Sequence, residues 1–173
     1  MIWQTPNRRI ATIALSILVM DQLTKFLILT FLPPGHEAVL VNGFFKFVRW
    51  GNKGAAWSLF EDSNFLLAAV SAVAMIALWY WRHHFEIRSL TGQISLGLVF
   101  GGILGNLLDR LNPFRYEPFR FQVIDFIRFY LYRRNGEEIG FPAFNVADSA
   151  ICVGVALLVI LSWIQESKRQ TNG

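Results

Sequence analysis

The sequence predicts a mainly α-helical membrane protein: a four-transmembrane-helix bundle with a small β-hairpin sheet at one membrane face. Hydrophobic residues make up 54% of the 173 residues and charged residues only 16%, which is more apolar than a soluble domain of this size. Four apolar stretches are long enough to span the bilayer. Two of the connections between them carry strand-like patterns, and we expect the whole chain, residues 1–173, to form one membrane domain.

The four apolar stretches cover residues 10–32, 65–81, 90–108 and 148–163. Because the number of spans is even, both termini should lie on the same side of the membrane. The first stretch follows Arg8-Arg9 as a secretory signal peptide would, but it is too long and ends at Pro33-Pro34 without a small-residue cleavage site. We therefore expect an uncleaved helix. The single cysteine, Cys152, lies in the fourth span and can form no internal disulfide.

The connections at residues 33–64 and 109–147 follow the first and third spans and therefore share one membrane face. In the first connection, apolar residues flank Asn42-Gly43, a dipeptide that accepts positive φ at both centres of a tight hairpin turn. In the second, residues 120–132 are rich in Phe, Ile, Val and Tyr and lead to Asn135-Gly136. We expect two hairpins that form a small sheet at the headgroups, with aromatic side chains partly immersed.

Small residues recur along the third span, at Gly97, Gly101, Gly102 and Gly105. This spacing allows another helix to approach closely. Packing inside the bundle is the favoured interpretation, and homodimerisation is the alternative.

Positive charge leaves the orientation open. Six cations lie in the two tails and the short loop after the second span, and nine lie in the two longer connections. A raw count would place the termini outside, but the rule applies to short solvated loops rather than folded segments. The net charge of +4 is compatible with contact to membrane lipids and gives no reason to expect nucleic acid.

Two charged residues lie within the first span, where charge is costly. Asp21 and Lys25 are four residues apart and share a helix face. An unpaired charge at such a depth costs at least about 2.5 kcal/mol, so each needs a partner or a polar cavity. A structural ion pair and a lining of the functional site are both open interpretations.

Other polar motifs lie near the membrane face that carries the long connections. Asn52-Lys53-Gly54 is typical of a turn, and the third span ends in a motif that contains Asn106, Asp109 and Arg110. Asn106 and Arg110 share a helix face if the helix continues that far. For Asp109 and Arg110 a structural Arg–carboxylate pair is the simpler explanation.

Two more carboxylates are the strongest catalytic candidates. Asp125 lies among apolar neighbours, and Asp148 lies at the start of the fourth span. The alternatives are a salt bridge from Asp125 to Arg110 or Arg128, and a capping role for Asp148 at a helix N-terminus.

A pair of acids in a desolvated site points to peptide hydrolysis. Both cannot ionise easily, so one holds a proton while the other acts as a base toward water. No metal or other cofactor is required. The residues needed for other hydrolytic chemistries are missing, because the three histidines form no HExxH pair and no G-x-S-x-G motif occurs.

The chain resembles the bacterial lipoprotein signal peptidase (signal peptidase II) family from the first span to the last. Five motifs carry the resemblance, in family order: Asp21-Gln22-Leu23-Thr24-Lys25, Asn52-Lys53-Gly54-Ala55-Ala56, Gly105-Asn106-Leu107-Leu108-Asp109-Arg110, Val123-Ile124-Asp125-Phe126, and Phe141-Pro142-Ala143-Phe144-Asn145-Val146-Ala147-Asp148.

The resemblance implies a membrane aspartyl endopeptidase of the bacterial cytoplasmic (inner) membrane, with both termini in the cytoplasm. Its substrates are diacylglyceryl prolipoproteins, cleaved just before the lipidated cysteine, and we expect it to act as a monomer. By position, the catalytic pair is Asp125 and Asp148. The residues implied to bind substrate or support the site are Asp21, Lys25, Asn52, Gly54, Asn106, Arg110, Asn145 and Ala147.

One segment departs from the family pattern. Members usually carry a glycine four residues before the catalytic aspartate, where this chain has Phe121, and residues 112–122 look like an insertion. Two other classes of protein remain as alternatives: a small transporter or proton-conducting subunit that uses the ionisable residues as a relay, and a structural assembly subunit.

Overall fold

The structure is a computed structural model that describes residues 6–54, 64–115 and 118–171. The chain runs α1 (Pro6–Phe31), β1 (Ala38–Val41), β2 (Phe45–Asn52), α2 (Asn64–Trp81), a 3₁₀ turn (Arg82–His84), α3 (Leu90–Leu111), β3 (Val123–Tyr132), β4 (Glu138–Gly140) and α4 (Val146–Thr171). All four α-helices are long and apolar enough to cross a membrane. The predicted four-helix bundle with a small sheet is therefore confirmed.

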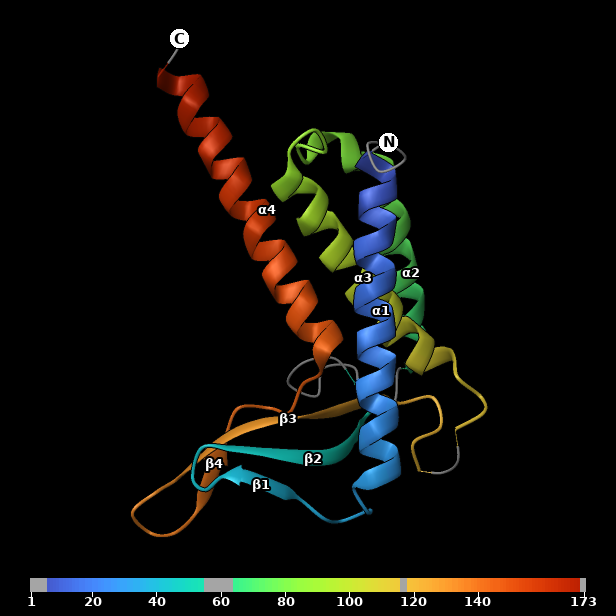
Figure 1. Ribbon diagram of the computed structural model, residues 1–173, viewed down its shortest axis with the longest axis vertical. Helices are drawn as coiled ribbons and strands as arrows, with labels where there is room; N and C mark the ends of the chain where they lie inside the picture. Colours follow the sequence, from blue (N-terminus) through green and yellow to red (C-terminus); the bar gives the residue numbers. More distant parts are fainter. Residues whose placement is uncertain (1–5, 55–63, 116–117, 172–173) are drawn as a thin grey trace.

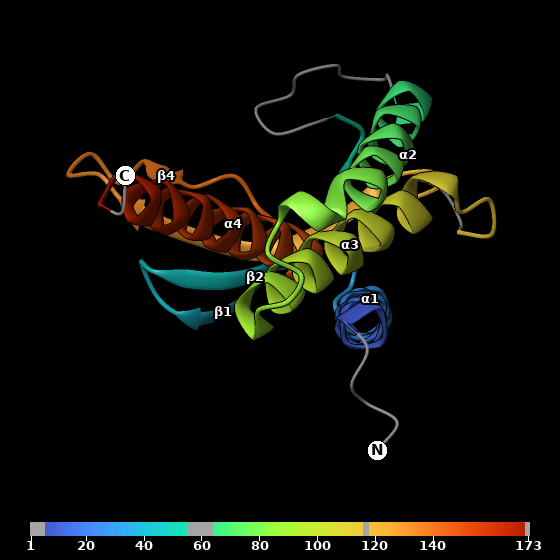
Figure 2. The same cartoon turned by 90° about the horizontal axis from the view of Figure 1, so that it is seen from above.

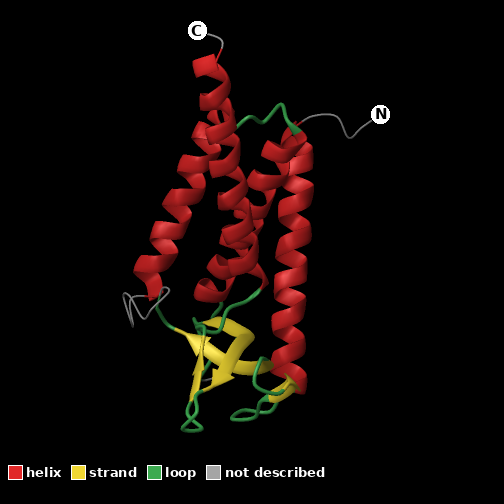
Figure 3. Cartoon of the chain, turned by 90° about the vertical axis from the view of Figure 1, so that its left-hand side faces the viewer, coloured by secondary structure: helices red, strands yellow, loops and turns green. Residues whose placement is uncertain are grey.

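The helices form a bundle with the sheet at one end and both termini at the other (Figure 1). α1 reaches further toward the sheet than α3 does, and α4 leans away from the bundle toward its C-terminal end (Figures 1 and 2). The side view shows the strands gathered at one end of the bundle, beside the last turns of α1 (Figure 3). The outer faces of α1, α2 and α4 expose large apolar side chains such as Phe26, Val73 and Trp163, as lipid contact requires.

α3 is the most buried helix and packs against each of the other three. Its glycines permit this central position: a Cβ on Gly101 would lie 2.7 Å from the backbone oxygen of Ala14 in α1, and Gly102 meets Ala147 in α4 in the same way. The expectation that these glycines serve packing inside the bundle is confirmed.

The strands form one antiparallel sheet in the order β1-β2-β3-β4. Both predicted hairpins are present, but the first turn differs from the expected type. Gly43 has φ +71° and Asn42 does not have positive φ, while the Phe44 amide donates to the Val41 carbonyl at 3.1 Å. This fits a type II turn, which requires positive φ at one centre rather than both.

A cluster of ion pairs links the strands of the sheet. Lys46 Nζ lies 2.6 Å from a Glu37 carboxylate oxygen and 2.7 Å from one of Glu138, and Arg128 pairs with Glu138 at 2.9 Å. These contacts raise the pKa of Lys46 against the effect of its burial and lower the pKa of Glu138. The hairpins are thereby joined across β2, β3 and β4.

Candidate active site

Lys25 lies at the centre of a buried ionic network between α1 and α3. Its Nζ is 2.7 Å from Asp21 Oδ2 and 2.8 Å from Asp109 Oδ2, and none of the three side chains is exposed. The same ammonium donates to Asn106 Oδ1 at 3.2 Å. The predicted pairing of Asp21 with Lys25 is therefore present. Lys25 also pairs with a second carboxylate, that of Asp109, which lies 84 residues after Lys25 in the chain.

The network reaches α4 through the second oxygen of Asp21. Asp21 Oδ1 accepts a hydrogen bond from the Ala147 backbone amide at 3.0 Å. Ala147 lies in the first turn of α4, whose amides have no partner inside the helix. A carboxylate at this end also interacts favourably with the helix dipole, so Asp21 stabilises the N-terminal end of α4 and ties it to α1.

Asn145 and Asp148 form a reciprocal cap at the start of α4. The Asp148 amide donates to Asn145 Oδ1 at 2.9 Å, and the Asn145 amide donates to Asp148 Oδ2 at 3.2 Å. Asn106 Nδ2 also donates to Asp148 Oδ1 at 2.7 Å. The capping role that the sequence suggested is present, and it coexists with a link to the third span.

Asp125 is held by amide side chains in place of cations. Its oxygens accept from Asn52 Nδ2 at 2.9 Å and from Asn145 Nδ2 at 2.7 Å. Burial and the negative charge of Asp148 raise the pKa of Asp125 to about 7, although both amide contacts act to lower it. Among the described residues no salt bridge joins Asp125 to Arg110 or Arg128; Arg110 donates to the Gly54 carbonyl and Arg128 pairs with Glu138.

Arg110 connects the end of α3 to the segment after β2. It donates to the Gly54 carbonyl at 3.1 Å, and the Gly54 amide in turn donates to Asn52 Oδ1 at 2.9 Å. The suggested pairing of Asp109 with Arg110 is absent among the described residues, because Asp109 binds Lys25 and Arg115. Ala55 and Ala56, which follow in the same motif, lie outside the described residues.

The structure thus joins all ten predicted site residues through hydrogen bonds at the sheet end of the bundle. Sequence reasoning missed the roles of three others. Gln22 donates to Asp109 Oδ1 at 3.0 Å and to the Gly105 carbonyl at 3.1 Å, and Arg115 lies 2.7 Å from Asp109 Oδ1. Gln22 and Asp109 lie within the quoted motifs, whereas nothing in the sequence pattern singled out Arg115.

The sequence model of signal peptidase (SPase) II matches residues 13–164 of this chain. The chain belongs to the signal peptidase II family. A lipoprotein signal peptidase of Anoxybacillus flavithermus is 30% identical over 158 residues, which cover 91% of this chain and 87% of the relative. As a family member, the protein is a membrane peptidase that removes signal peptides from lipoproteins.

Two solved structures, each described as a bacterial membrane enzyme, share this fold. The first has a TM-score of 0.73 and 29% sequence identity, and the match covers 91% of this chain and 88% of the chain in that structure. The second has a TM-score of 0.67 and 30% sequence identity, and the match covers 86% of this chain and 88% of the chain in that structure. The four-helix arrangement therefore occurs in experimental structures of related sequence.

Phe121, which stands where the signal peptidase II pattern usually has glycine, adopts a backbone conformation that is rare for residues other than glycine. Phe121 has φ +58°, in the left-handed region that glycine adopts at little cost and other residues seldom adopt. Its ring packs at 5.6 Å from that of Phe65, and its carbonyl accepts a hydrogen bond from Asn64. The turn before β3 thus has a backbone conformation suited to glycine, and contacts with α2 accompany the strain.

The buried network predicts a large effect of removing Lys25. In Lys25→Ala, Asp21 and Asp109 would lose their shared ammonium, and breaking such a buried pair typically costs about 3–5 kcal/mol. We expect a sharp fall in folded yield or turnover, measured by size-exclusion chromatography in detergent and by substrate cleavage. Arg88→Ala is the matched control, because Arg88 is exposed at the other end of the bundle. Equal, negligible effects of both variants would contradict this role.

Proposed function

We propose that this protein is an aspartic endopeptidase that cleaves diacylglyceryl prolipoproteins just before the lipidated cysteine, with Asp125 and Asp148 as the catalytic pair. The observation that carries the proposal is that Asn145 contacts both carboxylates, at 2.7 Å and 3.2 Å. Asn106 supports the same pair through its bonds to Asp148 and Asn145. Family membership supplies the reaction class.

The two aspartates differ in a way that suits acid and base roles. Asp125 is buried with a pKa of about 7, so it is mainly protonated below about pH 7. Asp148 lies in the first turn of α4 and accepts hydrogen bonds from two N–H donors. We assign Asp125 as the acid and Asp148 as the base in the attack step.

In the proposed mechanism, Asp148 takes a proton from water as the water oxygen bonds to the scissile carbonyl carbon. Asp125 gives its proton to the carbonyl oxygen, which yields a neutral gem-diol. The proton on Asp148 then passes to the amine nitrogen as the C–N bond breaks. A proton from the gem-diol returns to Asp125 as the new carboxyl group forms, so the pair regains its starting state.

The other site residues have supporting roles in this proposal. Asn52 and Asn145 orient the Asp125 carboxyl, and Asn106 orients Asp148. Arg110 and Gly54 hold the segment that carries Asn52. Asp21, Lys25 and Ala147 fix the helices against one another and touch neither proposed catalytic carboxylate in the described contacts.

The location of the pair fits a lipid-anchored substrate. A diacylglyceryl cysteine stays at the membrane surface. Asp125 belongs to β3 and Asp148 to the first turn of α4, and Figure 1 shows the start of α4 beside the sheet. The sheet also carries a cavity of about 380 Å³ lined by Phe44, Phe129 and Phe141 among other residues, which offers apolar surface for peptide or acyl chain. We place both termini in the cytoplasm and the sheet outside, and we expect a monomer.

Removing either carboxyl group should abolish catalysis. We expect Asp125→Asn and Asp148→Asn each to lose nearly all activity with the fold intact, because an amide can neither accept the proton of water nor supply one. The double variant should be little worse than either single one, since the two groups act as a unit. Gel separation of prolipoprotein from its cleaved product measures this.

Controls for this experiment come from the chain and from the substrate. Cys152→Ala should stay active, chelators should have no effect, and a substrate without diacylglycerol should resist cleavage. Substantial cleavage by either Asn variant, or full inhibition by a chelator, would refute the two-aspartate mechanism.

The raised pKa of Asp125 predicts a pH dependence with a definite sign. The acid form dominates below about 7, so kcat/KM should fall as pH rises through that value. The free energy of unfolding should respond in the same direction. The pKa of Asp125 is about 7 in the folded protein and 3.8 ordinarily, so the stabilisation from its protonation is complete below pH 3.8 and is lost as pH rises through about 7. Thermal unfolding of wild type and Asp125→Asn at pH 6 and pH 8 checks this. The variant should lose less stability than wild type, and an equal loss would contradict the assignment.

A further inference from the structure

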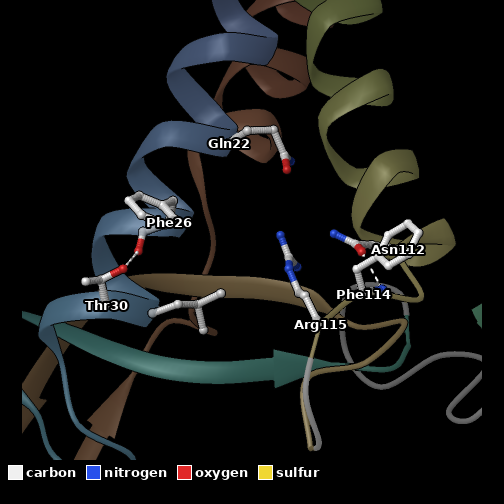
Figure 4. Close-up of a pocket in the computed structure, with 7 residues that line it drawn as sticks. Gln22, Phe26, Thr30, Asn112, Phe114 and Arg115 are labelled. Atoms are coloured by element: carbon white, nitrogen blue, oxygen red, sulfur yellow. Dashed lines mark hydrogen bonds between the residues drawn. The ribbon is translucent and has the colours of Figure 1, made fainter.

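The segment that departs from the family pattern contains a cation with little exposure, Arg115, that contacts the site network. Arg115 follows the end of α3, and only 12% of its side chain is exposed. Its guanidinium lies 2.7 Å from Asp109 Oδ1 and donates to the Gln122 carbonyl at 3.2 Å. Figure 4 shows this side chain extending toward Gln22 of α1, beside a cavity of about 550 Å³.

Asp109 and Arg115 together hold the backbone that leads into Asp125. Asp109 Oδ2 accepts from the Ile124 amide at 3.4 Å, and its Oδ1 binds the guanidinium that reaches Gln122. These two anchor points lie one and three residues before Asp125. A planar guanidinium can satisfy a carboxylate and a carbonyl at fixed angles, which makes it suited to such a bridge.

The same segment is also fitted against the strand that carries Asn52. A Cβ on Gly51 would lie 3.1 Å from Phe119 Cδ1 and would overlap the Gln122 side chain. Gly51 pairs with Ile124 in the β2–β3 register. Residues 118–122 therefore pack at the point where β2 and β3 bring Asn52 and Asp125 together.

We propose that Arg115 is a positioning residue, which fixes the backbone of residues 122–124 through Asp109 and so sets where the Asp125 carboxyl lies. This inference rests on the proposed function, because it assumes that Asp125 is catalytic. Arg115 contacts neither Asp125 nor Asp148 in the described structure, so its loss acts through geometry. A displacement of about 1 Å can lower turnover about 100-fold.

The test compares variants of the full-length protein in detergent with a diacylglyceryl prolipoprotein. Arg115→Ala should lower kcat by about 10- to 100-fold while KM stays within about twofold. Arg115→Lys should recover part of the loss, since an ammonium can pair with Asp109 without bridging to Gln122. Arg120→Ala is the matched control, because Arg120 is an exposed cation of the same segment that contacts the ring of Phe121, and it should match wild type.

A double-variant cycle keeps the test decisive if Arg115→Ala lowers stability. Arg115→Ala should add little to the kcat loss of Asp109→Asn, whereas Arg120→Ala should be additive with it. Activities are compared per folded molecule, from the monodisperse fraction. An unchanged kcat in Arg115→Ala, or a raised KM with kcat intact, would overturn the positioning role.

The same assay separates this inference from the proposed function. If wild type does not cleave, or if Asp125→Asn cleaves normally, the proposed function fails and the positioning role falls with it. If those two behave as proposed and Arg115→Ala matches wild type, only the positioning role is wrong.

Discussion

The burial of Lys25 between two carboxylates is the constraint on which the rest of the site depends. A charge inside an apolar bundle is costly unless its partners and hydrogen bonds are complete. Here Asp21 and Asp109 lie within 2.8 Å of the ammonium, so α1 and α3 can pack only in the register that brings them together. The glycines of α3 allow the required close approach.

The other contacts of these two carboxylates link the Lys25 network to the rest of the site. Asp21 binds the first turn of α4, and Asp109 binds Arg115 and the backbone before Asp125. α1, α3, α4 and the start of β3 are thereby linked to one ammonium group. The proposed catalytic carboxylates are contacted by amide side chains of Asn52, Asn106 and Asn145, which orient them without the full positive charge that would favour ionisation of both.

Local sequence rules predicted much of this architecture. They failed where contacts between residues far apart in the sequence determine the conformation or the hydrogen-bond partner. The four spans followed from apolar length, and both hairpins followed from their Asn-Gly turns. α4 nevertheless continues to Thr171, beyond the predicted end at residue 163, because polar residues can extend a helix past the bilayer. The left-handed Phe121 and the partners of Asp109 depend on residues far away in sequence, which periodicity does not register. The ten predicted site residues came from family motifs, whereas Arg115 lies in no such motif.

An experimental structure with a transition-state mimic would test the two-aspartate claim most directly. The mimic would be a lipidated signal-peptide analogue in which a hydroxyl-bearing carbon replaces the scissile carbonyl. We expect Asp125 and Asp148 each to lie within hydrogen-bond distance of that hydroxyl, in a groove open at the membrane interface. A complex in which the hydroxyl contacts neither carboxylate, or in which the two carboxylates lie on opposite sides of the bundle, would contradict the claim.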